Sequence, residues 1–187
     1  MSPLIIISIL LILFATFVNV TSILQGKAKP HRTTFFIFVV LNAIAFASLF
    51  AQHDRVAIYL ALLNGISASI IFLLSLKYGM GGWAPLDIFC LIIALAGIAL
   101  WKFTSNPVLA LYSSIVANFV CLLPTLIKVY YHPKTEVWGF WFIALVSFIL
   151  NLFAIKTWTF NAVIFPLYLA ASNAVVIFLI FRPHNKK

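Results

Sequence analysis

The chain has 187 residues, of which 65% are hydrophobic and only 8% are charged, and its formal net charge is +9. A soluble domain has an apolar share of about 50% and a charged share of about 25%, so this composition excludes a water-soluble protein. Most of the basic residues fall in short gaps between long apolar runs. This pattern indicates membrane topology rather than nucleic-acid binding.

Seven apolar runs follow one another along the chain, and each has about the 20 residues that a helix needs to cross a bilayer. They are predicted at 3–24, 34–51, 56–76, 86–103, 107–127, 137–155 and 160–181. The rest of the sequence forms only short loops, so we expect no soluble domain or nucleotide-binding module. The sequence therefore predicts an all-α polytopic membrane protein that acts within the bilayer.

Basic residues are distributed unequally between the two sides of this predicted bundle. The first, third and fifth loops and the C-terminal tail carry nine of them, and these are Lys27, Lys29, Arg32, Lys77, Lys128, Lys134, Arg182, Lys186 and Lys187. The other loops carry three, Arg55, Lys102 and Lys156. The positive-inside rule therefore places the C-terminus in the cytoplasm and the N-terminus outside. We expect an integral membrane protein, and its compactness and lack of targeting signals favour the bacterial inner membrane.

All five tryptophans lie near the ends of predicted spans, where an indole can remain at the headgroup level. They are Trp83, Trp101, Trp138, Trp141 and Trp158. Interfacial anchoring therefore mostly explains these positions without a binding site.

The first three spans match the last three at a constant offset of 103 residues. SLFA at 48–51 aligns with NLFA at 151–154, and Pro30 aligns with Pro133 within two similar basic loops. Both loops fall on the cytoplasmic side, so the repeats are parallel and need one extra helix between them. The predicted organisation is a first repeat at 1–78, a linker helix at 79–104 and a second repeat at 105–187. Chance similarity between apolar helices is the alternative explanation.

Two segments resemble a known superfamily. Pro124, followed by Lys134-Thr135-Glu136, resembles the PQ-loop pattern, and residues 63–78, with Asn64-Gly65, resemble the third helix of SWEET sugar transporters. The resemblance implies a SWEET-like fold of three plus one plus three helices, with a small-solute pathway between the two bundles. The sequence departs from the pattern at Thr125, where PQ-loop proteins carry glutamine, and at Leu167, where SWEETs carry asparagine. The fold is therefore implied more directly than a sugar substrate is.

Polar side chains are costly in lipid, so those within spans are expected to face a cavity or a neighbouring helix. The candidate substrate ligands are Asn64, Asn173, Ser48, Asn151 and Asn118. For each of them, a structural hydrogen bond to a neighbouring helix is the alternative role. Pro124 and Pro166 lie within helices and are the candidate hinges, because proline removes a backbone donor. Asn19 and Asn42 are further amides within spans.

An enzyme is not expected, because no nucleophile with a base and no pair of intramembrane carboxylates is visible. Asp87 suits the first turn of the fourth helix better than a proton-coupling site. No His or Cys spacing suggests a metal, and no cofactor is expected. We expect a small-solute facilitator that works by alternating access, or alternatively a non-transporting receptor, accessory or scaffold subunit on the same fold. The expected partners are a small-molecule substrate and the lipid bilayer, without nucleic acid, and a homo-oligomer is left open.

Overall fold

The computed structural model describes residues 3–51, 57–82, 84–104, 106–155 and 158–183. These residues form seven α-helices and one short 3-10 helix. The bounds are α1 (Pro3–Leu24), α2 (Arg32–Ala51), α3 (Ala57–Tyr78), α4 (Pro85–Thr104), α5 (Pro107–Tyr131), η1 (Pro133–Thr135), α6 (Trp138–Ala154) and α7 (Phe160–Phe181). The seven predicted helices and the all-α class are therefore confirmed.

Four of the helices are long and apolar enough to cross a membrane within the described residues. The qualifying segments are Pro3–Leu24, Ala61–Tyr78, Leu111–Tyr131 and Phe160–Phe181. The apolar segments Arg32–Ala47 and Trp138–Ala154 are shorter. These lengths and compositions suit an integral membrane protein.

The fifth helix is longer than predicted. It begins at Pro107 behind Asn106, whose Oδ1 accepts from the backbone N–H of Val108 at 2.9 Å, and it ends at Tyr131 instead of residue 127. This start combines a side-chain N-cap with proline at the first helical position. Pro124 therefore has about two turns of helix after it, whereas the predicted span at 107–127 leaves less than one turn.

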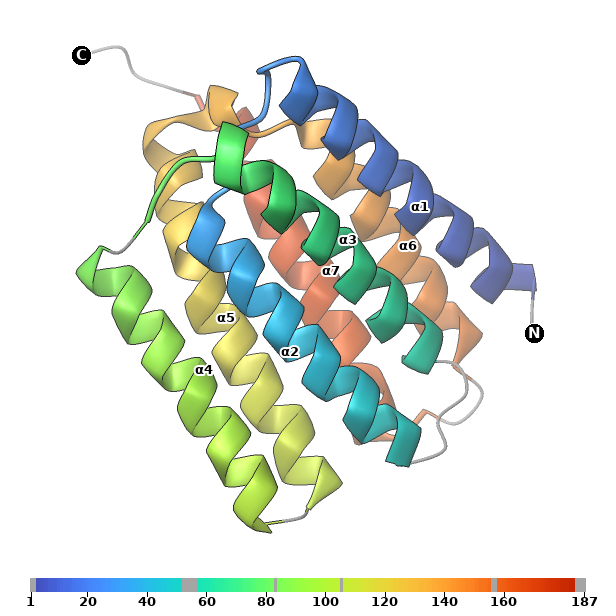
Figure 1. Cartoon of the computed structure of the whole chain (residues 1–187). Helices are drawn as coiled ribbons and strands as arrows, with labels where there is room; N and C mark the ends of the chain where they lie inside the picture. The colour runs from blue at the N-terminus through green and yellow to red at the C-terminus, as the bar shows by residue number, and fades with distance from the viewer. Residues whose placement is uncertain (1–2, 52–56, 83, 105, 156–157, 184–187) are drawn as a thin grey trace.

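We refer to α1, α2 and α3 as the first group of helices and to α5, α6 and α7 as the second group (Figure 1). In the first group α3 contacts both α1 and α2, and in the second group α7 contacts both α5 and α6. Within the described residues α1 does not contact α2, and α5 does not contact α6. Packing of α1 on α6 and of α2 on α5 joins the two groups, while α4 lies at one edge against α5 and α2.

The helix bounds of the two groups are also related. The C-terminal end of α7, at Phe181, lies 103 residues after the C-terminal end of α3, at Tyr78. This separation equals the offset found in the sequence.

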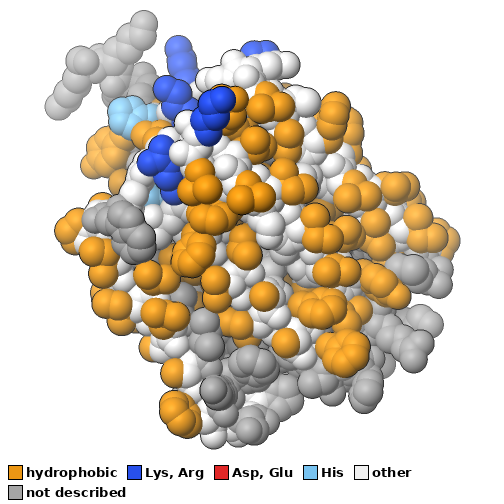
Figure 2. Space-filling view, viewed as in Figure 1, with side chains coloured by type: hydrophobic (Ala, Val, Ile, Leu, Met, Phe, Trp, Pro, Cys, Tyr) orange, Lys and Arg blue, Asp and Glu red, His pale blue; other side chains and the backbone are white. Residues whose placement is uncertain are grey.

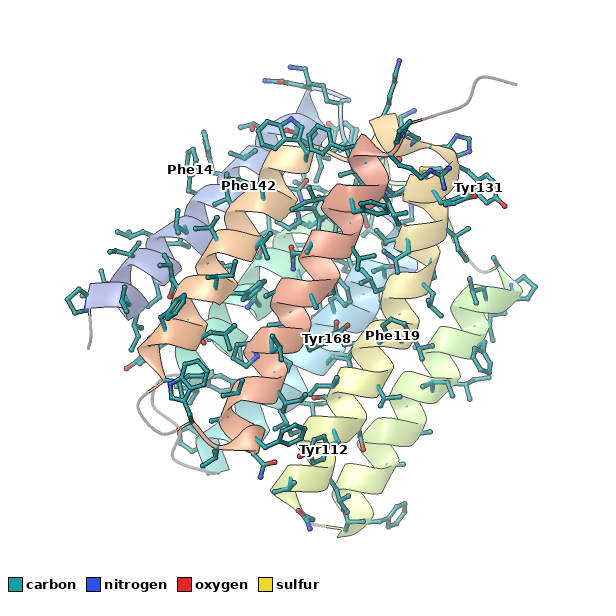
Figure 3. All side chains as sticks on the ribbon, turned by 180° about the vertical axis from the view of Figure 1, so that it is seen from behind. Phe14, Tyr112, Phe119, Tyr131, Phe142 and Tyr168 are labelled. Atoms are coloured by element: carbon teal, nitrogen blue, oxygen red, sulfur yellow. The ribbon has the colours of Figure 1, made fainter. Side chains whose placement is uncertain are left out.

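Apolar side chains cover the outer surface, and polar side chains are concentrated inside. Phe17 and Phe178 are 63% and 69% exposed, and Phe14 projects outward from α1 in Figure 3. By contrast, Asn19 and Asn151 are each 2% exposed. Such an inverted distribution is favourable in lipid, where the apolar side chains face acyl chains and the polar ones find partners inside.

Basic side chains gather at one end of the bundle, which we call the basic end. Figure 2 shows Lys and Arg together at the end where Figure 1 places the loops after α1 and α5 and the C-terminal end of α7. The described members are Lys27, Lys29, Arg32, Lys77, Lys128, Lys134 and Arg182. Among them only Lys128 is buried.

Candidate functional site

A cavity of about 90 Å³ lies between the two groups of helices. The described lining residues come from six helices, and none of them belongs to α4. Its lining residues on α1, α3 and α7, among them Thr16, Asn64 and Asn173, come from the middle of each helix. The cavity is smaller than the roughly 150 Å³ that accommodates benzene in an engineered apolar site. In this arrangement it has room for a solute of only a few non-hydrogen atoms.

Four asparagines from four different helices line this cavity. They are Asn42 on α2, Asn64 on α3, Asn118 on α5 and Asn173 on α7. The structure thus brings together three of the predicted ligands, Asn64, Asn118 and Asn173, and adds Asn42. Each carboxamide offers both donors and an acceptor, so the set suits an uncharged polar solute.

Two of these carboxamides are fixed by bonds to their own helices. Asn42 Nδ2 donates to the Phe38 carbonyl and Asn173 Nδ2 donates to the Leu169 carbonyl, each at 2.7 Å. These bonds follow the i to i−4 pattern that polar side chains commonly adopt within helices. They limit rotation of the two amides, so the cavity wall is preorganised on α2 and α7.

Asn118 and Asn64 are held differently. The hydroxyl of Tyr168 donates to Asn118 Oδ1 at 3.4 Å, and Tyr168 lies on α7 facing α5 (Figure 3). The Nδ2 atom of Asn64 is buried and has no hydrogen-bond partner among the residues that the structure describes. A buried amide donor without a partner costs about 1–3 kcal/mol, so it is expected to be retained for a reason other than stability.

Hydroxyl groups complete the polar part of the lining. Thr16 Oγ1 donates to Ser67 Oγ at 2.8 Å, and both residues line the cavity with Ser172. No Asp, Glu, Lys, Arg or His lines the cavity in the part of the chain that the structure describes. The absence of formal charge there disfavours a charged solute, which would be left unpaired at low dielectric.

Aromatic side chains form the wall nearest to the basic end. Phe35 and Phe38 come from the start of α2, and Phe140 and Trp141 come from the start of α6. Phe38 and Trp141 are 103 residues apart and both line the cavity.

The interpretation of Trp141 as an interfacial anchor is wrong. Trp141 is 5% exposed, lines the cavity and donates its indole N–H to Glu136 Oε2 at 3.1 Å. Trp138 and Trp158 are 51% and 65% exposed, as an anchor requires. Nearness to a span end alone does not distinguish these cases, because successive residues of a helix point in different directions. The relevant feature of the sequence is Glu136, five residues before Trp141, because its carboxylate accepts the hydrogen bond from the indole N–H.

The remaining predicted site residues lie away from the cavity or outside the described atoms. Asn151 is buried one turn beyond Phe148 on α6, does not line the cavity, and has an Nδ2 atom without a partner. The side chains of Ser48 and Asp87 lie outside the described residues. Pro124 and Pro166 are both buried within their helices, α5 and α7.

The described residues contain no group of three His, Cys, Asp or Glu side chains placed to hold a metal ion. Comparisons with protein families, with curated proteins and with solved structures found no match for this chain. The cavity that the four asparagines line is the feature from which we infer a function.

Proposed function

We propose that the protein is a membrane transporter for small uncharged polar solutes. The observation that carries the proposal is the convergence of four asparagines from four helices on one uncharged cavity in the middle of the bundle. Polar cavities at this depth, between groups of helices, are typical of repeat-built transporters. The unpartnered Nδ2 of Asn64 supplies a donor for such a solute.

We further propose a SWEET-like arrangement of two parallel repeats joined by α4. Three observations support it: the matching contacts of α3 and α7 within their groups, the separation of 103 residues between the C-terminal ends of these two helices, and the absence of α4 from the described lining of the cavity. In this proposal the groups rock against each other around the cavity. Pro124 and Pro166 act as hinges, because each interrupts the backbone hydrogen bonding of a helix that lines the cavity.

The basic end faces the cytoplasm in this proposal, with the N-terminus on the other side. The gathering of described Lys and Arg residues at one end supports this orientation through the positive-inside rule. The bacterial inner membrane is the proposed location. Because no charged group is found among the described residues that line the cavity, we propose facilitated diffusion rather than ion-coupled uptake.

The alternative is a non-transporting receptor or accessory subunit on the same fold. The small volume of the cavity favours it, because a hexose requires more space than about 90 Å³. In that role the asparagines would serve only to join helices. The two functions make opposite predictions for Asn64.

Replacing Asn64 by alanine is expected to lower solute entry about tenfold, the effect of losing one hydrogen bond worth about 1.4 kcal/mol. Entry is measured by light scattering of proteoliposomes swelling in glycerol, erythritol, a pentitol or a hexose, with protein-free liposomes as the baseline. The thermal unfolding midpoint is expected to stay unchanged or to rise, because the variant removes a buried donor without a partner.

Asn151→Ala is the matched control, because Asn151 is also buried with an unpartnered Nδ2 but does not line the cavity. It is expected to transport at the wild-type rate. Equal losses in the two variants would contradict the assignment of the site. A wild-type protein that accelerates entry of none of these solutes would favour the receptor or accessory function.

A further inference from the structure

A buried ion pair lies directly beyond the aromatic wall of the cavity, at the basic end. The ammonium of Lys128 on α5 pairs with Glu136 Oε1, and their side chains are only 5% and 3% exposed. Glu136 follows η1 and precedes α6, so the pair closes the loop between the two helices. Buried charges are costly unless each is fully partnered, so the other partners of these two groups are informative.

Each member of the pair has one further partner. Lys128 Nζ donates to the backbone carbonyl of Lys29 at 2.8 Å, and Glu136 Oε2 accepts from the indole N–H of Trp141 at 3.1 Å. Lys29 belongs to the loop after α1, in the first group of helices, while the other three residues belong to the second group. The chain of bonds therefore runs from the cavity wall at Trp141 to the opposite helix group.

Other bonds between the two groups lie at the same end. The Lys29 backbone N–H donates to the Thr135 carbonyl at 2.9 Å, and the Thr34 hydroxyl donates to the Cys121 carbonyl at 3.0 Å. Thr125 Oγ1 also donates to Thr34 Oγ1 at 3.2 Å. Together these bonds hold the α1–α2 loop and the start of α2 onto α5 and η1. The groups cannot separate at this end while the bonds persist.

We propose that Lys128, Glu136 and Trp141 form the gate at the basic end of the solute pathway, with Trp141 linking the gate to the cavity. This inference rests on the proposed transport function. A solute that displaces the Trp141 ring shifts the N–H away from Glu136, which weakens the hold of Glu136 on Lys128. Lys128 then releases the Lys29 carbonyl, and the first group is free to swing outward. A ligand shifts the equilibrium between the closed and open gate only if it binds one of these states more tightly than the other. Contact between the solute and the Trp141 ring would differ between the two states and would supply this difference in affinity.

The gate is tested by the accessibility of a cysteine in the cavity, which requires no knowledge of the solute. Ser67→Cys is introduced with Cys90→Ala and Cys121→Ala, and sealed vesicles of both orientations are treated with a membrane-impermeant maleimide. A separate Lys134→Cys protein, with its reporter on an exposed residue of the basic end, identifies the vesicle orientation. Glu136→Gln is expected to raise labelling of position 67 from the basic end about tenfold, as a shift of about 1.4 kcal/mol between states would. Labelling from the other end is expected to stay constant or fall.

Trp141→Phe keeps an aromatic ring but removes the donor to Glu136, so it is expected to change labelling in the same direction by a smaller factor. If Glu136→Gln does not fold, the labelling of Trp141→Phe tests the gate in its place. Lys134→Gln, a neutralised exposed residue in the same loop, is the matched control and is expected to label like the parent protein.

Three outcomes would overturn the gate. These are unchanged labelling in the folded variants, a rise that is equal from both ends, or the same rise in Lys134→Gln. The first shows that the network does not close the pathway, the second shows general loosening, and the third shows a net-charge effect. Altered labelling without transport of any solute would instead overturn the proposed function and leave the gate as a conformational element.

Discussion

Replacing Lys128 by methionine is expected to lower the free energy of unfolding by about 3–5 kcal/mol, because Glu136 is then left as an uncompensated buried charge. The measurement is equilibrium unfolding of the purified protein in mixed micelles. The double variant Lys128→Met/Glu136→Gln is expected to recover much of this loss. In it no charge remains buried, while the glutamine side-chain oxygen still accepts from Trp141.

Lys134→Met is the matched control for Lys128→Met, since both change a lysine near the same loop and Lys134 is exposed. Its expected effect is within about 0.5 kcal/mol of zero, as for most surface substitutions. The interaction free energy of the pair follows from the cycle of the two single variants and the double variant. A Lys128→Met protein as stable as Lys134→Met would show that the buried pair contributes little.

Gly79→Ala is expected to lower the free energy of unfolding by about 2–3 kcal/mol, because a Cβ at this position overlaps rigid backbone. It would meet the carbonyl oxygens of Ser75 and Pro30 inside 3.0 Å. The same junction holds the end of α3 to the loop after α1, since the Met80 backbone N–H donates to the Pro30 carbonyl at 3.0 Å. Arg32 adds side-chain bonds to the carbonyls of Ser75 at 2.9 Å and Gly79 at 3.0 Å.

Alanine variants at two other glycines serve as controls, because they measure the effect of replacing a glycine where an added Cβ meets no close neighbour. Gly82 has no heavy atom within 4 Å of an added Cβ and no positive φ, so Gly82→Ala is expected to change stability by less than about 0.5 kcal/mol. Gly26 also has open space but a φ of +72°, so Gly26→Ala is expected to cost about 1–2 kcal/mol. Thermal or denaturant unfolding of the three variants checks the order. A Gly79→Ala protein no less stable than Gly26→Ala would contradict the close approach.

The helices themselves were predictable from the sequence, because the length and apolarity that a bilayer demands are properties of one segment at a time. α1 and α7 have the predicted bounds, and the other helices differ from their predicted spans by a few residues at one or both ends. The extension of α5 to Tyr131 was missed for a physical reason. Lys128 ends an apolar run, but a buried partner lets the helix continue past this charge.

The candidate site was predictable only in part. Asn64, Asn118 and Asn173 lie on the cavity wall, and an inward position could be predicted because amides are costly in lipid. An inward-facing side chain can lie at any depth along the bundle. Asn151, for example, is 2% exposed but does not line the cavity. Asn42 lines the cavity, although the residues around it in the sequence are no more distinctive than those around Asn151. The difference lies in how α2 and α6 pack against the other group.

The amino-acid sequence by itself determined the class of protein, the number of helices, the unequal charge of the loops and the offset of 103 residues, since each depends on composition or on spacing along the chain. Only the tertiary structure decided that Trp141 is buried and that Lys128, Glu136 and the Lys29 carbonyl meet. Lys29 and Lys128 are 99 residues apart, and their contact follows from the packing of two helix groups rather than from any local pattern. Desolvation makes this contact matter, because a charge that is harmless in a wet loop must be fully partnered once packing removes the water.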